Sequence, residues 1–203
     1  YALCALGGWL HSSDNSAPSC TYGYLWDTGA KSTLYNDNAS ANPMARVWST
    51  GVYKSGPDNT DIRKSSISGF GIGIAAYDGT VTADAHGGLN FGWNRINAVS
   101  TVLASDLNGF IDFGDAYPLY AGTENCFILQ DYTNGYHAWT GNKVIQAAAS
   151  YWQPDSIKTY GPVIWRYPEP SCPAPFVGTG GHDALSKSVS SPPPGNRHAD
   201  MVR

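Results

Sequence analysis

Charged residues are scarce in this chain of 203 residues. Asp, Glu, Lys and Arg make up 14% of it, and Glu occurs only as Glu124 and Glu169. Helical proteins of the cytosol use Glu and Lys heavily on their helix surfaces. This chain uses Gly, Ser, Thr, Asn and Tyr instead, which favours strands and turns. The net charge of −4 comes with no basic stripe, so we expect no nucleic-acid partner.

Long apolar runs are also missing. No stretch approaches the roughly 20 apolar residues of a membrane-spanning helix, so we expect no membrane span. The sequence begins at Tyr1 with no charged and apolar leader before it. We therefore expect either a mature secreted protein or a domain of a longer chain, located outside the cell or on a particle surface.

The sequence contains four cysteines and no CxxC pair or other compact metal-ligand pattern. An even number of cysteines in an acidic, lysine-poor chain indicates two disulfides, and three pairings are open. Proximity in sequence favours Cys4–Cys20 and Cys126–Cys172. Four buried free thiols, as in a reducing compartment, are the alternative.

Catalytic and metal-binding motifs are few. There is no GxSxG, no HExxH and no phosphate-binding loop. Asp84 and His86 are spaced to share one face of a strand, but a zinc site would need a third ligand from far away in the sequence. We therefore expect no metal and no cofactor.

Strand signals dominate the chain, and the clearest lies at residues 65–82. Ile67, Phe70, Ile72 and Ile74 recur with the alternation of a strand, and Asp78-Gly79 is typical of a hairpin turn. Asn134-Gly135 predicts a second hairpin. The expected fold is mainly β: an antiparallel β-sandwich or β-barrel with one or two short helices.

One helix is expected at residues 94–107, because Ile96, Val99, Leu103 and Leu107 recur at helical spacing. No internal repeat and no domain boundary are evident. We expect one β-rich domain over residues 1–185, followed by a proline-rich strap or tail over residues 186–203.

Three carboxylates are the candidate catalytic residues. Asp112 and Asp115 flank Gly114, and Glu124 follows soon after. Glycoside hydrolysis needs a protonated acid facing an ionised partner, and neighbouring aromatic residues could raise the pKa of one carboxyl by excluding water. Asp beside Gly at the end of a strand is also ordinary turn chemistry.

Aromatic residues are plentiful: 7 Trp, 13 Tyr and 6 Phe. Tyr and Trp combine an apolar ring with a polar end, which suits half-exposed sites. Sugars stack on such rings through their CH faces while their hydroxyls bind nearby polar groups, and protein recognition uses the same mixture. The candidate ligand-binding residues lie in turn-like segments, and they are Trp93, Asn94, Arg95, Tyr136, Trp139 and Trp152.

Two functions follow from these patterns. The first is an extracellular recognition domain, with a possible homodimer, that binds a glycan or a protein receptor through aromatic residues. The second is a secreted hydrolase or lyase that acts on polysaccharide through a carboxylate pair. In composition alone, the chain resembles receptor-binding spike domains of viral capsids and small secreted enzymes acting on polysaccharides, and composition does not choose between the two.

Overall fold

The computed structural model describes residues 3–5, 9–26, 31–82, 92–106, 108–113, 125–141, 143–147, 150–164 and 172. In these ranges the chain is mainly β, as expected, but every strand pairing is parallel. The prediction of an antiparallel sandwich or barrel is therefore wrong. Alternation of apolar and polar residues identifies a strand and not the direction of its neighbour.

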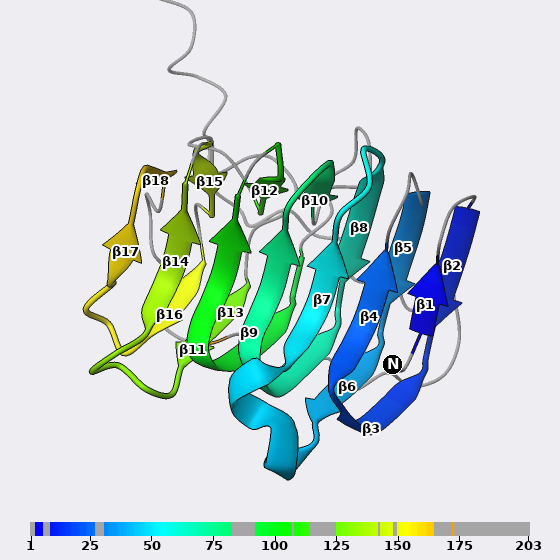
Figure 1. Ribbon diagram of the computed structural model, residues 1–203, viewed down its shortest axis with the longest axis horizontal. Helices are drawn as coiled ribbons and strands as arrows, with labels where there is room; N and C mark the ends of the chain where they lie inside the picture. Colours follow the sequence, from blue (N-terminus) through cyan, green and yellow to red (C-terminus); the bar gives the residue numbers. More distant parts are fainter. Residues whose placement is uncertain are drawn as a thin grey trace, which may run out of the picture.

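The strands form two sheets (Figure 1). The seven-stranded sheet contains, in order, β2 (Trp9–Ser13), β5 (Lys31–Tyr35), β8 (Asn59–Arg63), β10 (Thr80–Thr82), β12 (Phe110–Asp112), β15 (Ile145–Gln146) and β18 (Val163–Ile164).

The eleven-stranded sheet has two parts. Its front part contains β1 (Leu3–Ala5), β4 (Tyr22–Trp26), β7 (Thr50–Lys54), β9 (Ser66–Ala76), β11 (Arg95–Ser105), β14 (Tyr136–Thr140) and β17 (Thr159–Tyr160). Its other part adds β3 (Ser16–Cys20), β6 (Asn38–Ala41), β13 (Cys126–Leu129) and β16 (Tyr151–Gln153). The two long strands β9 and β11 run through both parts, because their first residues pair with β6 or β13 and their last residues pair with β7 or β14.

The order of the strands describes a parallel β-helix. From β4 the chain passes to β5 in the other sheet, then to β6, and returns beside β4 as β7. Tyr22 lies opposite Thr50, Thr50 opposite Ile72, and Ile72 opposite Thr101, so successive coils take 28, 22 and 29 residues. These unequal coil lengths explain why the sequence shows no repeat.

The helix expected at residues 94–107 is instead strand β11. Register shifts with β9 lie between Asn97 and Thr101. As a result, Ile96 on one side of the irregularity and Leu103 on the other are both fully buried. Their separation imitates helical spacing, although both side chains enter the core from a strand.

The two expected hairpins are also absent. Gly79 has a positive φ of 71° and does lie in a turn, but β9 before it and β10 after it belong to different sheets. Likewise, β14 after Asn134-Gly135 pairs in parallel with β11 and β17. Each dipeptide lies at a corner of a coil, where the chain passes from one strand to the next. The two strands on either side of it do not pair with each other.

The single helical element described is the 3-10 helix η1 (Pro43–Trp48), which projects beyond the lower ends of the front strands (Figure 1). Asn42 caps it by accepting a hydrogen bond from the Met44 N–H. A Cβ at Gly71 would meet the carbonyl oxygens of Arg46 and Val47, so glycine at this position lets η1 pack on β9.

The core fills the space enclosed by the coils, and its aromatic side chains include Tyr24, Phe70, Phe113, Phe127 and Trp152. A Cβ at Gly51 would collide with the Ile67 side chain, and one at Gly73 would collide with that of Ile96. Glycine at these inward positions therefore makes room for the bulky side chains of neighbouring strands.

A row of polar residues runs through the interior at one corner of successive coils. The residues are Asn15, Asp37, Ser65, Asn94, Asn125 and Ser150, each directly before a strand residue in mutual register. All but Asn15 are at most 1% exposed. We call this row the polar ladder.

Hydrogen bonds along the first four steps of the polar ladder join one coil to the next. The backbone N–H of Asn15 donates to Asp37 Oδ1 at 2.7 Å, and that of Asp37 donates to Ser65 Oγ at 3.2 Å. The N–H of Ser65 donates to Asn94 Oδ1 at 3.0 Å, and that of Asn94 donates to Asn125 Oδ1 at 3.1 Å. Buried backbone donors at the corner thus find side-chain acceptors where the coil turns.

Where the structure describes it, the residue before a ladder position turns the chain. Four such residues have a positive φ of 47–59°, and they are Asp14, Asn36, Lys64 and Trp93. This left-handed conformation costs roughly 1–2 kcal/mol for a residue with a Cβ. The hydrogen bonds of the polar ladder stabilise the corner against that cost.

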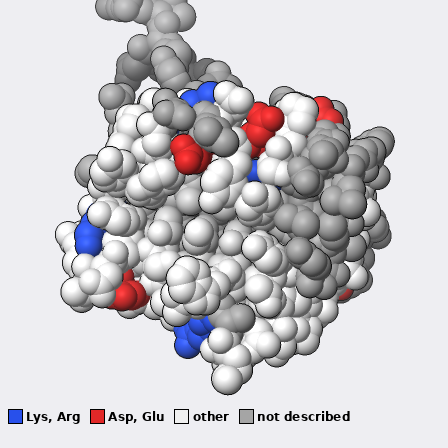
Figure 2. All heavy atoms as spheres, viewed as in Figure 1, with Lys and Arg blue, Asp and Glu red and all other residues white. Residues whose placement is uncertain are grey.

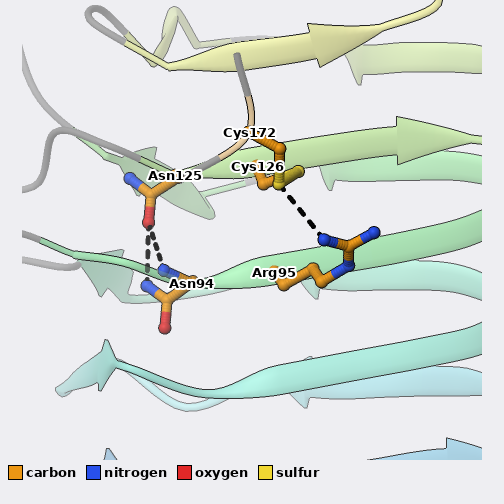
Figure 3. The surroundings of a disulfide bond; sticks show 5 residues. All are labelled: Asn94, Arg95, Asn125, Cys126 and Cys172. Atoms are coloured by element: carbon orange, nitrogen blue, oxygen red, sulfur yellow. Dashed lines mark hydrogen bonds between the residues drawn. A yellow bond between two sulfur atoms is a disulfide. The ribbon is translucent and has the colours of Figure 1, made fainter. Parts of the chain in front are cut away.

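The disulfide Cys126–Cys172 is formed, as predicted (Figure 3). It closes a separation of 46 residues on the outer side of β13. Cys20 is a free thiol, so the predicted pairing of Cys4 with Cys20 is wrong. The proline-rich segment 186–203 lies outside the described residues.

Asp37 offers a direct test of the polar ladder. Burial raises the pKa of its carboxyl, although hydrogen bonds from Ser12 and Asn15 act in the opposite direction. A raised pKa means that stability is fully present below the ordinary value of 3.8 and falls as the pH rises through the folded-state pKa.

We therefore expect Asp37→Asn to stabilise the protein at neutral pH, because Asn keeps the acceptor and carries no charge. The expected rise in Tm is about 2–4 °C, the effect of about 1 kcal/mol in a chain of this size. Differential scanning calorimetry should show the gain shrinking below pH 3.8. The reverse change two positions further along the ladder, Asn94→Asp, is the matched control and should destabilise. A lower Tm for Asp37→Asn at pH 7 would contradict this account.

Candidate functional site

A cavity of about 320 Å³ lies on the outer side of the front strands. Its lining comes from β9, β11, β14, the residues just after β9 and β11, and the turn before β14. The residues are Ile72, Tyr77, Ser100, Thr101, Ala104, Ser105, Asp106, Asn134, Tyr136 and Trp139. Its volume is at the lower end of the range found for small-molecule sites. Aromatic rings and small polar groups therefore share one concave surface.

Three tyrosines contact one another along one side of this cavity. The Tyr53 ring on β7 packs against that of Tyr77 at 5.2 Å between centroids. Tyr22 on β4 meets Tyr53 edge to face at 6.2 Å. We call Tyr22, Tyr53 and Tyr77 the tyrosine cluster, and its member Tyr77 lines the cavity.

A second aromatic group lies at the other side. Trp139 and Tyr160 occupy adjacent strands in register, and their rings stack at 6.0 Å with planes only 9° apart. Tyr136 meets Tyr160 edge to face at 6.3 Å. We call Tyr136, Trp139 and Tyr160 the tryptophan cluster. Tyr160 is 55% exposed, so this cluster presents ring surface to solvent.

Small side chains separate the two clusters. In the row that begins with Tyr53 on β7, the next positions are Ala75 on β9, Ala104 on β11 and Trp139 on β14. Three strand spacings of about 4.8 Å place the flanking aromatics roughly 14 Å apart. Ala104 lines the cavity, whereas Ala75 is 1% exposed and does not line it. The open space therefore lies over β11, between Tyr77 and Trp139.

The front face carries little charge. In Figure 2 the middle of this face is white, and the coloured atoms of Lys, Arg, Asp and Glu lie towards its margins. Asp106 is the one charged residue that lines the cavity in the described part of the chain. An uncharged ligand therefore fits this surface better than a strongly charged one.

His137 supports the strand that carries Tyr136 and Trp139. Its ring is buried among Trp152 and Tyr132. Its Nδ1 accepts a hydrogen bond from the Lys158 backbone N–H at 3.1 Å, so Nε2 carries the proton and donates to the Gln153 carbonyl at 2.9 Å. The neutral imidazole thus ties β14 to the segment that leads into β17.

Lys158 reinforces the same connection. Its ammonium group donates to the carbonyls of Tyr132 and Thr133 and lies 5.2 Å from the centre of the Tyr136 ring. A cation over an aromatic face is attracted by the ring's quadrupole. The Lys158 ammonium therefore stabilises the position of the Tyr136 ring, although Lys158 does not itself line the cavity.

Of the six residues proposed from sequence as ligand-binding, the structure brings Tyr136 and Trp139 together in the cavity. Trp152 is 2% exposed and packs against Phe127 in the core. Asn94 belongs to the buried polar ladder (Figure 3). These two side chains do not face solvent.

Trp93 and Arg95 lie away from the cavity. Trp93 occupies the left-handed corner position, and the Lys64 ammonium is 5.3 Å from its ring centre. Arg95 is exposed on β11 and donates to Cys172 Sγ at 3.3 Å beside the disulfide (Figure 3). Neither residue lines the concave surface.

The proposed carboxylate cluster is only partly described. Asp112 lies on β12 in the seven-stranded sheet, away from the strands that line the cavity. Asp115 and Glu124 lie outside the described residues, as do Asp84 and His86.

In the described ranges, no group of three or more His, Cys, Asp or Glu side chains could hold a metal ion. Nor is any helix of this part long and apolar enough to cross a membrane.

Sequence reasoning missed Tyr53, Tyr77, Tyr160 and Asp106 as site residues. Each belongs to a different coil or to the turn after a strand. Only the parallel register places them beside Tyr136 and Trp139. No local motif marks them, because coils of unequal length conceal the alignment.

The His137 contacts predict a pH dependence of stability. Burial lowers the pKa of His137, partly offset by its bond to Gln153. Its contribution is therefore complete above the ordinary value of 6.5 and declines as the pH falls through the lower folded-state value. We expect His137→Gln, which keeps a donor and an acceptor, to lose less stability than the native chain between pH 7.5 and 5.

Urea unfolding midpoints at the two pH values measure this difference. His11→Gln, at an exposed histidine, is the matched control and should behave like the native chain. An equal acid-induced loss in the native protein and in His137→Gln would contradict the assignment.

The site combines two aromatic clusters, a cavity lined between them by small side chains, and one carboxylate, on a β-helix. Comparison with known proteins adds no family to this description. No protein-family model matches the chain, no curated protein matches it, and no solved structure matches it. The geometry of the front face is therefore the basis for the functional proposal.

Proposed function

We propose that this chain is an extracellular carbohydrate-recognition domain that binds a glycan on its front face. One observation carries the proposal: the tyrosine and tryptophan clusters flank a cavity whose centre is made of small side chains. Sugar rings present CH faces that stack on aromatic rings, and their hydroxyls bind polar groups at the edges. The cavity supplies both kinds of partner.

The two clusters lie in one row across the strands, which favours a glycan chain over a single sugar as the ligand. Tyr53, Ala75, Ala104, Trp139 and Tyr160 lie in one row that crosses five neighbouring strands. A glycan chain running across the strands, along the β-helix axis, would meet Tyr77 on one side of Ala104 and Trp139 on the other. The disulfide Cys126–Cys172 is compatible with an extracellular location.

Binding is favoured over hydrolysis by the acids present. Glycoside hydrolysis by a carboxylate pair needs a second acid about 5–9.5 Å from the first. Among the described lining residues, Asp106 has no second carboxylate beside it. A reducing-sugar assay run with the binding assay tests the hydrolase alternative, and release of sugar would favour it.

A protein receptor is the second candidate, and η1 supports it. Met44, Val47 and Trp48 are 95%, 64% and 85% exposed, and exposed apolar side chains of this size often mark protein contacts. They lie on η1 and not among the residues lining the cavity. Variants can therefore separate the two kinds of recognition.

We expect Trp139→Ala and Tyr136→Ala each to weaken glycan binding about tenfold or more, because a large stacked aromatic is a typical binding hot spot. A glycan array identifies the ligand, and isothermal titration calorimetry measures the loss. Trp48→Ala is the matched control, since it removes an exposed Trp outside the cavity. Equal losses in Trp48→Ala and Trp139→Ala, or no loss in either cavity variant, would contradict the proposal.

A further inference from the structure

We propose that Asn108 is a site of spontaneous deamidation, and that the Asp131 side chain protects Asn134 from the same reaction. The sequence contains two Asn-Gly pairs, Asn108-Gly109 and Asn134-Gly135. The structure holds the side chains of the two asparagines differently, although their backbones are alike. This chemistry is independent of the proposed glycan binding, because it needs only the protein and water.

Deamidation at an Asn-Gly pair requires two neighbouring groups to meet. The backbone nitrogen of the glycine attacks Cγ of the asparagine, so that an N–Cγ bond forms and the Cγ–Nδ2 bond breaks. Ammonia leaves with the proton displaced from the glycine nitrogen. Water then opens the cyclic imide at either carbonyl, which gives aspartate or isoaspartate. Glycine favours the attack because it has no Cβ that would hinder the approach.

The backbones of the two pairs are held in the same way. The Gly109 N–H donates to the Asp106 carbonyl at 2.8 Å, and the Gly135 N–H donates to the Asp131 carbonyl at 2.8 Å. Both glycines are buried, and the asparagine before each is exposed. The glycine nitrogens therefore do not distinguish the pairs, and a difference in rate has to come from the asparagine side chains.

The Asn134 side chain is bound to a carboxylate three residues earlier. Its Nδ2 donates to Asp131 Oδ2 at 3.2 Å and lies 3.5 Å from Oδ1, while the Asn134 backbone N–H donates to Oδ1 at 3.2 Å. We call these bonds the Asp131 latch. The side chain has to leave the latch before its Cγ can meet the Gly135 nitrogen.

The Asp131 latch is ionised at the pH values where deamidation proceeds. Hydrogen bonds from Asn134 lower the pKa of the Asp131 carboxyl, so the group is a carboxylate at neutral and alkaline pH. An ionised acceptor makes stronger hydrogen bonds than a neutral one. Breaking such bonds at an exposed position is enough to slow the attack about fivefold or more.

The Asn108 side chain has no comparable restraint. Among the described residues, none accepts a hydrogen bond from its amide. Its backbone is bound instead, because the N–H donates to the Tyr77 carbonyl at 3.1 Å and the carbonyl accepts from the Lys143 ammonium at 2.8 Å. The side chain can therefore turn until its Cγ meets the Gly109 nitrogen.

The protected pair lies in the wall of the cavity. Asn134 lines the cavity, and Tyr136, the first residue of β14, follows two positions later. Deamidation at Asn134 would put a second carboxylate beside that of Asp131. As isoaspartate, it would also lengthen the backbone just before β14. The Asp131 latch therefore keeps Tyr136 in place as the protein ages.

Ageing of the full chain tests the inference. The folded protein is kept in a warm, mildly alkaline buffer, and peptide mapping by mass spectrometry follows aspartate and isoaspartate at each pair. We expect Asn108 to deamidate about fivefold faster than Asn134, or more. In urea, where the latch is lost, the two asparagines should react at similar rates.

Asp131→Ala should raise the rate at Asn134 to about that at Asn108 and leave Asn108 unchanged. Asp155→Ala, which removes an exposed carboxylate outside the latch, is the matched control and should change neither rate. Equal rates at the two asparagines of the folded native chain would overturn the inference, as would an unchanged rate at Asn134 in Asp131→Ala. So would a folded chain in which Asn108 stays intact while the chain in urea reacts there.

A second variant covers the case in which Asp131→Ala loosens more than the latch and accelerates Asn108 as well. Asp131→Asn keeps an oxygen acceptor and the size of the side chain but removes the charge. The quantity compared is the rate at Asn134 divided by the rate at Asn108. A ratio above the native one supports the latch, and the native ratio would overturn it.

Discussion

The hydrogen-bonded polar ladder is the interaction on which the rest of this structure depends. At this corner of four coils the chain turns through a left-handed residue, and a buried backbone N–H would otherwise lack a partner there. A side-chain oxygen from the next coil accepts that hydrogen bond, as Ser65, Asn94 and Asn125 do. Each coil is thereby held in register with its neighbour, despite insertions that change coil length.

Register between the coils assembles the candidate binding surface. Because every strand is parallel to the next, one position in a coil continues into the same position of the following coil. The row from Tyr53 to Tyr160 exists for this reason, and so do the alanines between its aromatic ends. A shift of one residue in any coil would turn its outward side chains into the core. The polar ladder therefore positions the cavity, although it lies on another side of the coil.

The sequence contains the strands but conceals their arrangement. The alternation around Ile67 and Ile74 predicts a strand correctly, and it is equally consistent with parallel and antiparallel neighbours. Strand β11 imitates a helix because its register shifts bring Ile96 and Leu103 inward at helical spacing. For the site, aromatic turn segments indicated Tyr136 and Trp139. Tyr77 and Asp106 could not be added, because their proximity is set by register across coils and not by local pattern.

The central claim is that a glycan lies against the tryptophan cluster, and the indole N–H signals of the seven tryptophans test it most directly. A ¹⁵N-labelled sample would be titrated with the best neutral oligosaccharide from a glycan array, after the Trp48, Trp139 and Trp152 resonances are assigned by substitution. The account predicts that the Trp139 signal shifts in a saturable way, while the signals of exposed Trp48 and buried Trp152 stay in place. Saturable shifts of Trp48 with an unmoved Trp139 would contradict it.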